Sequence, residues 1–281
     1  MGKHYIPRYY LSGFTQKSKP PLIWVYEKGS SQVFATQIKN VGHETYYFPD
    51  NFETYLANEI ETPANIVLRK IGERKIITTE DKIILSNYIV VLRKRVPESK
   101  ERLKEEAPKI SDEIKKKLFK KIEDLKIKNP SKANLLEKRR REAQDILEKF
   151  KDSPPEEAWR SAIRPEMTPR MSEALSKMTW RFFVCEEPNA FLTNDNPVFI
   201  FRHIGIGNKY SELTFPVSSY ITLWATWRLL DEGYYPANNQ VVKEINRRTA
   251  SIATRYIYFS KKRDWVITLA NKKEHRLTYI I

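Results

Sequence analysis

Residues 78–95 read TTEDKIILSNYIVVLRKR, and this stretch decides the kind of fold that the chain adopts. Its first four residues, Thr78 to Asp81, form a capping sequence of the kind that begins a helix. The residues from Ile83 to Leu92 then place apolar side chains on nearly every side of that helix, a pattern typical of burial in a core. They are too few to span a bilayer. We therefore expect a central buried helix around which the other elements pack.

The sequence before this helix predicts a hairpin and two short helices. Residues 22–26 and 32–34 are rich in β-branched and aromatic residues and flank the turn sequence EKGSS, so they predict a β-hairpin. Between positions 52 and 71, apolar residues recur at helical spacing on either side of Pro63. This spacing predicts two short helices with a break at the proline.

Charged residues dominate positions 98–152, where 18 Lys or Arg stand against 13 Asp or Glu and apolar residues form a thin stripe. This composition predicts a surface helical hairpin that turns near Asn129-Pro130-Ser131. The segment contains one dense basic run, formed by Lys138, Arg139, Arg140 and Arg141. Such a run is either a nucleic-acid contact or the solvated face of a helix. The hairpin also offers a surface for a protein partner.

The rest of the chain alternates between predicted strands and one helix. Residues 180–184 and 190–193 flank the sequence EEPN and resemble a second hairpin. Further predicted elements are strands at 220–227, 256–259 and 265–269 and a helix at 238–253. Strands on both sides of a helical middle indicate an α+β fold, with antiparallel sheets packed on buried helices. We expect residues 1–97 and 153–281 to form one core, into which a charged helical hairpin, residues 98–152, is inserted.

Net charge, cysteine content and the first residues limit which classes of partner and which cell compartment we expect. The formal net charge is +15, which favours RNA or DNA as a partner, although a lysine-rich solubilising surface gives the same sum. Cys185 is the single cysteine, so no intrachain disulfide and no multi-cysteine metal cluster can form. The first residues, MGKHYIPR, match neither a signal peptide nor a myristoylation pattern. We expect a cytoplasmic protein that does not enter a membrane.

Two polar positions in apolar surroundings are candidates for chemistry. The sequence contains no Walker loop, GxGxxG, HExxH or GxSxG motif. His4 lies in an aromatic N-terminal stretch, where a docked imidazole is an acid, a base or a ligand, or else a hydrogen-bonded structural histidine. Asp195 and Asn196 end an aromatic strand. A carboxylate there reaches a metal or a substrate proton, or the pair forms an Asx-turn before Pro197.

The same residues carry a resemblance to a known family. The opening HYxPxxYLxxF, from His4 to Phe14, and the late FLTxDNP, from Phe191 to Pro197, resemble the pattern of an uncharacterised, mostly bacterial group, domain-of-unknown-function family 4238. The resemblance continues in order through Phe52-Glu53 to Glu61, Leu92 to Pro97, Phe215 to Ser218, Asn246, and Arg255 to Tyr258. It covers nearly the whole chain. Asn194 stands where the pattern has serine, and the charged middle section is particular to this sequence.

The resemblance implies candidate site residues, not a reaction. His4, Glu61 and Asp195 are the implied catalytic residues, and together with Glu53 they are the motif residues able to bind a divalent metal. Glu53 and Glu61 are eight residues apart, so one continuous helix would carry them on similar faces, although each could equally be a capping or salt-bridging carboxylate. The implied substrate-binding residues are Arg8, Arg93, Arg95 and Asn196, with the arginines suited to phosphate.

Two main hypotheses follow. In the first, the protein is a metal-dependent nuclease or another phosphodiester-cleaving enzyme, a bacterial defence effector against phage, with Mg²⁺ or Mn²⁺ held by His4 and the carboxylates. In the second, it is a non-catalytic module that binds nucleic acid or protein through its basic surface and exposed aromatic residues. A third, recognition of a small nucleotide beside His4 and Asp195, lacks a phosphate loop. Convergence of His4, Asp195 and a glutamate in space would favour chemistry.

Overall fold

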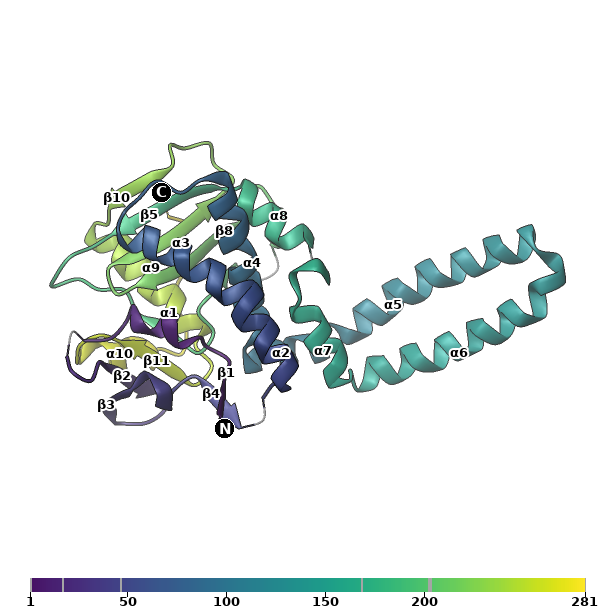
Figure 1. Ribbon diagram of the computed structural model, residues 1–281, viewed down its shortest axis with the longest axis horizontal. Coiled ribbons are helices and arrows are strands. Elements are labelled where there is room, and N and C mark those ends of the chain that lie inside the picture. Colours follow the sequence, from purple (N-terminus) through teal and green to yellow (C-terminus); the bar gives the residue numbers. More distant parts are fainter. Residues whose placement is uncertain (1, 17, 46, 168, 202–203, 281) are drawn as a thin grey trace. The chain divides into compact units, whose positions relative to one another are not determined.

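The computed structural model describes residues 2–16, 18–45, 47–167, 169–201 and 204–280 (Figure 1). The chain divides into two compact units, one formed by Met1–Val96 with Pro165–Ile281 and the other by Pro97–Arg164. Helices and mostly antiparallel sheets occur together in the first unit, which confirms the α+β prediction. No helix in the part of the chain that the structure describes is long and apolar enough to cross a membrane.

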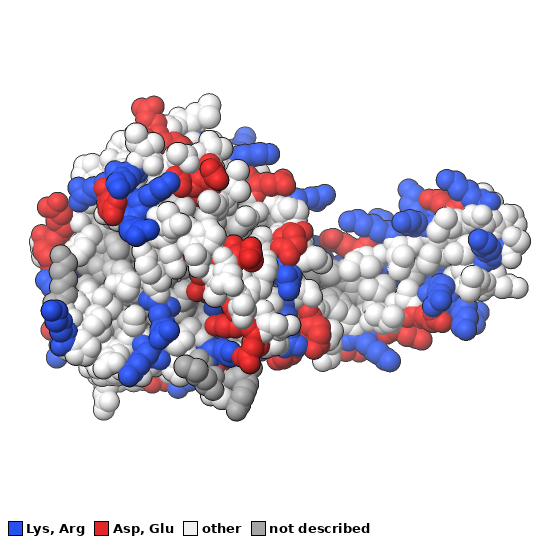
Figure 2. Space-filling model, in the orientation of Figure 1, with Lys and Arg blue, Asp and Glu red and all other residues white. Residues whose placement is uncertain are grey.

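The second unit is a helical hairpin with one further helix. Helix α5 (Pro97–Lys128) and helix α6 (Ala133–Asp152) are joined through a 3-10 turn at Pro130–Lys132, at the predicted position. Helix α7 (Glu156–Ile163) follows, and Trp159 on it donates a hydrogen bond to Ser99 at 2.7 Å. Figure 2 shows basic and acidic side chains interspersed along this unit. The thin apolar stripe packs α5 against α6, and the charges face solvent.

The larger sheet of the first unit has five strands in the order β10-β5-β9-β8-β7. Their bounds are β5 (Thr179–Val184), β7 (Phe199–Ile200), β8 (Glu212–Ser218), β9 (Ile221–Thr226) and β10 (Gly233–Pro236). Nearly every residue of β8 and β9 is buried, so this part of the sheet is covered on both faces. The β10–β5 pair is parallel, a departure from the all-antiparallel sheet that was expected.

A second sheet has four strands in the order β3-β2-β11-β6, and a third pairs β1 with β4. Their bounds are β1 (Gly2–His4), β2 (Leu22–Glu27), β3 (Val33–Gln37), β4 (His43–Thr45), β6 (Thr193–Asn194) and β11 (Tyr256–Phe259). The β2–β3 hairpin confirms the first predicted hairpin. The second predicted hairpin is wrong, because β5 pairs with β9 and β10 whereas β6 pairs with β11. The connection after Val184 therefore leads from one sheet to the other.

The predicted central helix is α4 (Thr79–Arg95), and the Thr78–Asp81 capping box is present. Ahead of it, α2 (Asp50–Tyr55), a π-helical segment at Leu56–Glu61 and α3 (Thr62–Gly72) follow one another without a loop. The predicted break at Pro63 is wrong, because the helical backbone continues through this proline, which lies where the π-helical segment passes into α3. This unit also contains α1 (Arg8–Ser12), α8 (Pro169–Lys177) and the 3-10 turns Ile38–Asn40 and Pro165–Met167.

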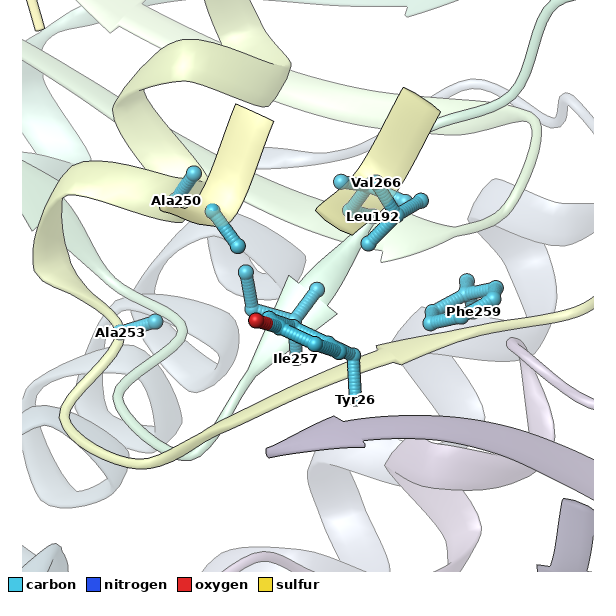
Figure 3. Packing of buried hydrophobic residues seen from close by; sticks show 8 residues of the cluster. Tyr26, Leu192, Ala250, Ala253, Ile257, Phe259 and Val266 are labelled. Carbon is cyan, nitrogen blue, oxygen red and sulfur yellow. The ribbon is translucent and has the colours of Figure 1, made fainter. Parts of the chain in front are cut away.

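Two further helices cover one face of the four-stranded sheet. Helix α9 (Asn239–Ile252) corresponds to the predicted helix, and Asn238 caps it by accepting from the Val241 N–H. Residues 265–269, predicted as a strand, belong to helix α10 (Trp265–Ala270). Figure 3 shows Ala250 of α9 and Val266 of α10 facing Ile257 and Tyr26 of the sheet. Val266 and Ala270 are four apart and both buried, so the helical period prevailed over the strand propensity.

Candidate functional site

Arg95, the last residue of α4, lies at the centre of the cluster that the sequence nominated. Its side chain is only 1% exposed. One guanidinium nitrogen donates to Glu61 Oε1 at 2.5 Å, and the other donates to the His4 carbonyl oxygen. The ring of Phe48 lies 5.6 Å from Arg95 Cζ. Arg95 thus joins the N-terminal strand β1, the π-helical segment and the end of α4.

Glu53 lies in α2, ahead of the π-helical segment that ends at Glu61. Residues eight apart diverge by about 80° on a regular α-helix, and the wider i→i+5 turn reduces that divergence. Both carboxylates consequently interact with Arg95. Burial raises the pKa of Glu53, the neighbouring Glu61 adds to the rise, and Arg95 opposes it. The Oε2 atom of Glu53 is buried and accepts no hydrogen bond within the described residues.

His4 ends β1 directly opposite His43 of β4, and their ring centroids are 5.3 Å apart. Burial lowers the pKa of His4 to about 4, the charges of His43 and Arg8 act in the same direction, and a hydrogen bond to the Lys39 backbone opposes them. The imidazole is therefore neutral at pH 7. Its Nε2 atom is buried and has no hydrogen-bond partner among the described residues. A neutral imidazole in this state can accept a proton or a ligand.

Of the other two predicted arginines, Arg8 lies near His4 and Arg93 binds a different segment of the chain. Arg8 is exposed at the start of α1 and acts on His4 through its charge. Arg93 is half-buried on α4 and donates to the Val198 carbonyl at 3.3 Å. This bond connects α4 to the segment that follows the late motif. Arg95 is therefore the predicted arginine that contacts the glutamate cluster directly.

Asp195 is engaged at a different place, the connection from α9 to β11. Its Oδ1 accepts from the Thr254 N–H at 2.8 Å, and its Oδ2 accepts from the N–H groups of Arg255 and Tyr256 at 2.7 and 3.1 Å. Burial raises the pKa of Asp195, while these three donors oppose the rise. Such a carboxylate fixes a turn that is distant in the sequence, which differs from the local Asx-turn considered for this residue.

The two asparagines of the late motif fix the end of α9. Asn194 donates from its side-chain amide to the Thr249 carbonyl at 2.5 Å, and Asn196 donates to the Ile252 carbonyl at 3.2 Å. The Asn194 side-chain oxygen also accepts from the Asn196 backbone N–H at 2.8 Å. Carbonyls in the last turn of a helix lack helical partners, and side-chain donors supply them.

The structure thus places His4, Glu53 and Glu61 around Arg95. Asp195 instead binds the backbone of the connection between α9 and β11. Within the described residues, no group of three or more His, Cys, Asp and Glu side chains is arranged to hold a metal ion. Glu61 is bonded to Arg95, and both oxygens of Asp195 accept from the backbone.

The basic run on α6 is largely paired within its own helix. Arg139 forms an ion pair with Glu142 at 2.8 Å, and Arg140 and Arg141 approach Glu137 at 3.3 and 4.0 Å. The Arg140 guanidinium also lies 4.7 Å from the centroid of the Phe119 ring on α5. Lys138 is exposed. These pairs match the solvated-face interpretation and leave part of the positive charge accessible.

A groove that the sequence did not predict lies between α9 and α10. It has a volume of about 420 Å³. Lys243 and Arg247 line it from α9, Trp265 and Leu269 from α10, and Lys272 from the segment after α10. The Trp265 side chain is 41% exposed. The groove therefore combines three cations with an accessible aromatic ring.

The pKa of His275 reflects the positive potential beside this groove. Burial lowers the pKa of His275, and the charges of Lys28, Lys272 and Arg247 lower it further, with Glu244 opposing. Three cations close enough to act on one imidazole make this part of the surface favourable for an anion. Arg247 retains 40% side-chain exposure and only a 3.5 Å approach to Glu244, so most of its hydrogen-bonding capacity remains toward solvent.

Asn246 holds α9, and with it the groove, in place through two backbone hydrogen bonds. Its side-chain oxygen accepts from the Leu192 N–H at 2.9 Å and its amide donates to the Ala190 carbonyl at 2.9 Å, so α9 is fixed to the late motif. Lys243 and Arg247 are one turn apart on α9, a spacing that was visible in the predicted helix. The sequence did not identify Trp265 as a groove residue, because residues 265–269 were predicted as a strand and not as a helix packed beside α9.

Fold and site together define an α+β protein with a buried arginine–carboxylate cluster and a separate basic, aromatic groove. The chain belongs to the family described as "Protein of unknown function (DUF4238)", whose family model matches residues 3–263. This confirms the resemblance carried by the two terminal motifs. A search of curated proteins and a search of solved structures each found no match.

Proposed function

We propose that the protein binds single-stranded nucleic acid through the groove between α9 and α10. The supporting observation is that Lys243, Arg247 and Lys272 share one groove with the exposed ring of Trp265. Single strands are bound by cations that follow the backbone and by aromatic rings on which bases stack. A groove of about 420 Å³ falls at the lower end of the range for small-ligand sites, which suits one nucleotide unit at a time.

The partner and the compartment follow from this proposal. The net charge of +15 attracts a polyanion from beyond the groove itself. RNA and DNA present the same phosphates and stackable bases to such a groove, so both are ligands to be tested. We propose that the protein acts in the cytoplasm, where both are accessible.

The test is the affinity of the full chain for fluorescein-labelled single-stranded RNA and DNA of equal length, measured by anisotropy. Trp265→Ala should lower the affinity by roughly five- to a hundredfold, the range that stacking of one base supports. Arg247→Glu should lower it at least as much, because it reverses a charge at the phosphate position. The matched controls are Tyr210→Ala, an exposed ring elsewhere, and Lys177→Glu, an exposed lysine at the end of α8.

The controls decide the outcome. Affinity that falls in the groove variants and stays within about twofold in the controls supports the site. Equal losses in groove and control variants would mean that binding reflects only the overall charge, and the groove would then have no role.

A metal-dependent nuclease, acting in bacterial defence against phage, is the second candidate. It is favoured by the meeting of His4, Glu53 and Glu61 at Arg95. Magnesium is often held by one or two carboxylates together with substrate phosphate, so Glu53 with a bound phosphodiester would suffice for Mg²⁺ or Mn²⁺. A bound ion would supply Lewis-acid chemistry at the phosphate, neutral His4 would accept the proton of the attacking water, and the ester oxygen would leave with a proton from solvent.

Cleavage of labelled RNA and DNA with Mg²⁺, Mn²⁺ or EDTA tests this candidate. His4→Ala and Glu53→Gln should each abolish metal-dependent cleavage, and His43→Ala, the exposed neighbour of His4, should retain it. Absence of cleavage by the folded wild type with either metal would exclude the nuclease while leaving the binding proposal intact.

A further inference from the structure

His4 and His43 lie directly opposite each other where β1 pairs with β4. Opposite residues of an antiparallel pair place their side chains on the same face, so the two imidazoles are neighbours. The pairing continues beyond the strands, because the Ile6 N–H donates to the Gly42 carbonyl at 3.1 Å. Gly42 has a φ of +64°, and a Cβ atom there would lie 3.0 Å from the Ile6 side chain. The two backbones are therefore held close together beside the histidines.

The His4 side chain has the tautomer of a metal-binding histidine. Its hydrogen bond to the Lys39 backbone raises the pKa of the ring, so a ring N–H donates this bond to the carbonyl oxygen. The Nε2 atom has no hydrogen-bond partner among the described residues, so Nδ1 is the donor and Nε2 carries the lone pair. A histidine that binds a metal usually donates its other ring N–H to a backbone carbonyl or a carboxylate, which fixes the ring. His4 meets this condition, with Lys39 as the acceptor.

The distance between the two rings fits a shared zinc ion. A zinc ion lies about 2.0 Å from an imidazole nitrogen and hence about 3.2 Å from the centroid of that ring. Two such rings at the tetrahedral angle have centroids about 5.2 Å apart, whereas adjacent ligands of a square-planar ion have centroids about 4.5 Å apart. The centroids of His4 and His43 are 5.3 Å apart, which matches the tetrahedral value. His43 is exposed, so its ring can turn to direct a nitrogen at the ion.

Two positive charges oppose a cation at this place. Arg8 and Arg95 both lower the pKa of His4 through their charges. Arg95 is paired with Glu61, and Arg8 is exposed, so solvent screens its charge. We therefore expect these charges to reduce the affinity for a metal ion and not to prevent its binding.

We propose that His4 and His43 bind a zinc ion, with water in the remaining positions. Imidazole suits Zn²⁺, whereas Mg²⁺ takes oxygen ligands. With two protein ligands, the site is weaker than the three- and four-ligand sites of zinc enzymes and zinc fingers.

This zinc site goes beyond the proposed groove between α9 and α10 and uses none of its residues. It is also an alternative to the role of His4 in the nuclease candidate, in which Nε2 accepts a proton and His43 has no part. A nitrogen bound to zinc has no lone pair left for a proton. Zinc binding and nucleic-acid binding can therefore succeed or fail independently.

The test is isothermal titration calorimetry of the untagged full chain, freed of metal with EDTA and dialysed, with zinc chloride. We expect one saturable ion per chain and no saturable binding of magnesium chloride at this site. His43→Ala should weaken zinc binding at least about tenfold, because it removes one of the two protein ligands. His275→Ala, at another partly buried histidine, is the matched control and should change the affinity less than about twofold.

Two further measurements separate this site from the glutamate cluster and from a variant that misfolds. Glu53→Gln should leave zinc binding unchanged, and loss in this variant with retention in His43→Ala would assign the ion to the glutamates and overturn the proposal. Circular dichroism checks that His43→Ala is folded, as its exposure leads us to expect. Cobalt in place of zinc should give the intense visible absorption of a tetrahedral site. Weak cobalt bands, or no zinc binding by the folded wild type, would also overturn the proposal.

Discussion

At the scale of single residues, burial decides the protonation states around Arg95. Desolvation is the first cause of the shifted pKa values of both His4 and Glu53; at His4 the charges of His43 and Arg8 add to it, and at Glu53 it outweighs the opposing charge of Arg95. The result is a neutral imidazole beside the guanidinium that binds Glu61. Sequence motifs identified these residues, because the histidine and both glutamates recur in the family pattern. They could not show that Asp195 accepts hydrogen bonds from backbone N–H groups, because those groups belong to residues 254–256, which only the folded chain brings near it.

The depressed pKa of His4 predicts that the protein loses stability in acid. An unfolded histidine takes up a proton near pH 6.5, whereas His4 in the fold does so only near pH 4. The free energy of unfolding should therefore fall as the pH decreases from 7 to 4, by roughly 1–2 kcal/mol for a half-exposed group. Urea denaturation at several pH values measures this. His4→Gln should flatten the profile, and His43→Gln should retain most of it, since burial is the larger cause.

Removal of Arg95 should be costly. Arg95→Ala leaves Glu61 and the His4 carbonyl without their donor, and we expect the free energy of unfolding to fall by about 3 kcal/mol. Arg95→Lys should give an intermediate loss, because an ammonium cannot reproduce the forked geometry. Thermal denaturation by circular dichroism measures both. Arg69→Ala, an exposed arginine on α3, is the control, and a loss there as large as that of Arg95→Ala would contradict the assignment.

At the scale of elements, the late motif acts as a clamp on α9. Asn194 and Asn196 bond the carbonyls of its last turn, and Asn246 bonds the backbone of Ala190 and Leu192, where the motif begins. Lys243 and Arg247 are neighbours of Asn246 on the helix, and all three residues line the groove. The motif residues are therefore structural supports for a surface made by residues that the motif does not include.

The clamp predicts a large effect of Asn246→Ala on stability. Two buried backbone groups, the Leu192 N–H and the Ala190 carbonyl, would lose their partner, at a cost of about 2–4 kcal/mol. The exposed pair Asn189–Asn239 offers a comparison, because Asn189→Ala removes a similar hydrogen bond at the surface and should cost less than about 0.5 kcal/mol. Chemical denaturation of both variants at pH 7 distinguishes them. Equal costs would show that the clamp contributes nothing particular.

Local patterns predicted the elements that depend on local forces. The capping box of α4, the β2–β3 hairpin and the turn between α5 and α6 were all predictable from their own residues. Pairing between distant segments was not, since β5 finds its neighbours about forty and fifty residues later in the chain. The strand predicted at 265–269 is wrong because Val266 and Ala270, one helical turn apart, are buried together in the cluster that α10 forms with α9 and the sheet. The groove forms where α10 packs beside α9, so it could not be predicted while residues 265–269 were taken as a strand.

At the scale of the whole molecule, positive charge is spread over both units. Unit 2 contains the basic run on α6, and unit 1 contains the groove cations. Much of the charge on α6 is already paired with glutamates one turn away, whereas no ion pair is described for Lys243 or Lys272. We therefore expect local pairing, more than the total of +15, to determine where a polyanion would bind.

The salt dependence of binding should report the number of cations that contact phosphate. Three groove cations predict that the logarithm of affinity falls with the logarithm of salt concentration at a slope of about −2 for a single strand. Anisotropy titrations between about 50 and about 300 mM salt, which lie on either side of the physiological value of about 150 mM, measure the slope. Replacing Lys138 and Arg139 to Arg141 with glutamate should leave it near −2. A slope near −5 that this replacement reduces would assign the contact to α6 instead.

The π-helical segment at Leu56–Glu61 has a consequence for how this chain tolerates insertions and deletions. A π turn accommodates one residue more than an α turn, and a deletion there would convert the segment into a regular helix. With one residue deleted, Glu53 and Glu61 would be seven apart on a regular helix and diverge by only about 20°, so both would still face Arg95. The π segment thus allows the helix to carry one additional residue while Glu61 keeps its bond to Arg95. The requirement here is the direction in which Glu61 faces, and two different spacings meet it.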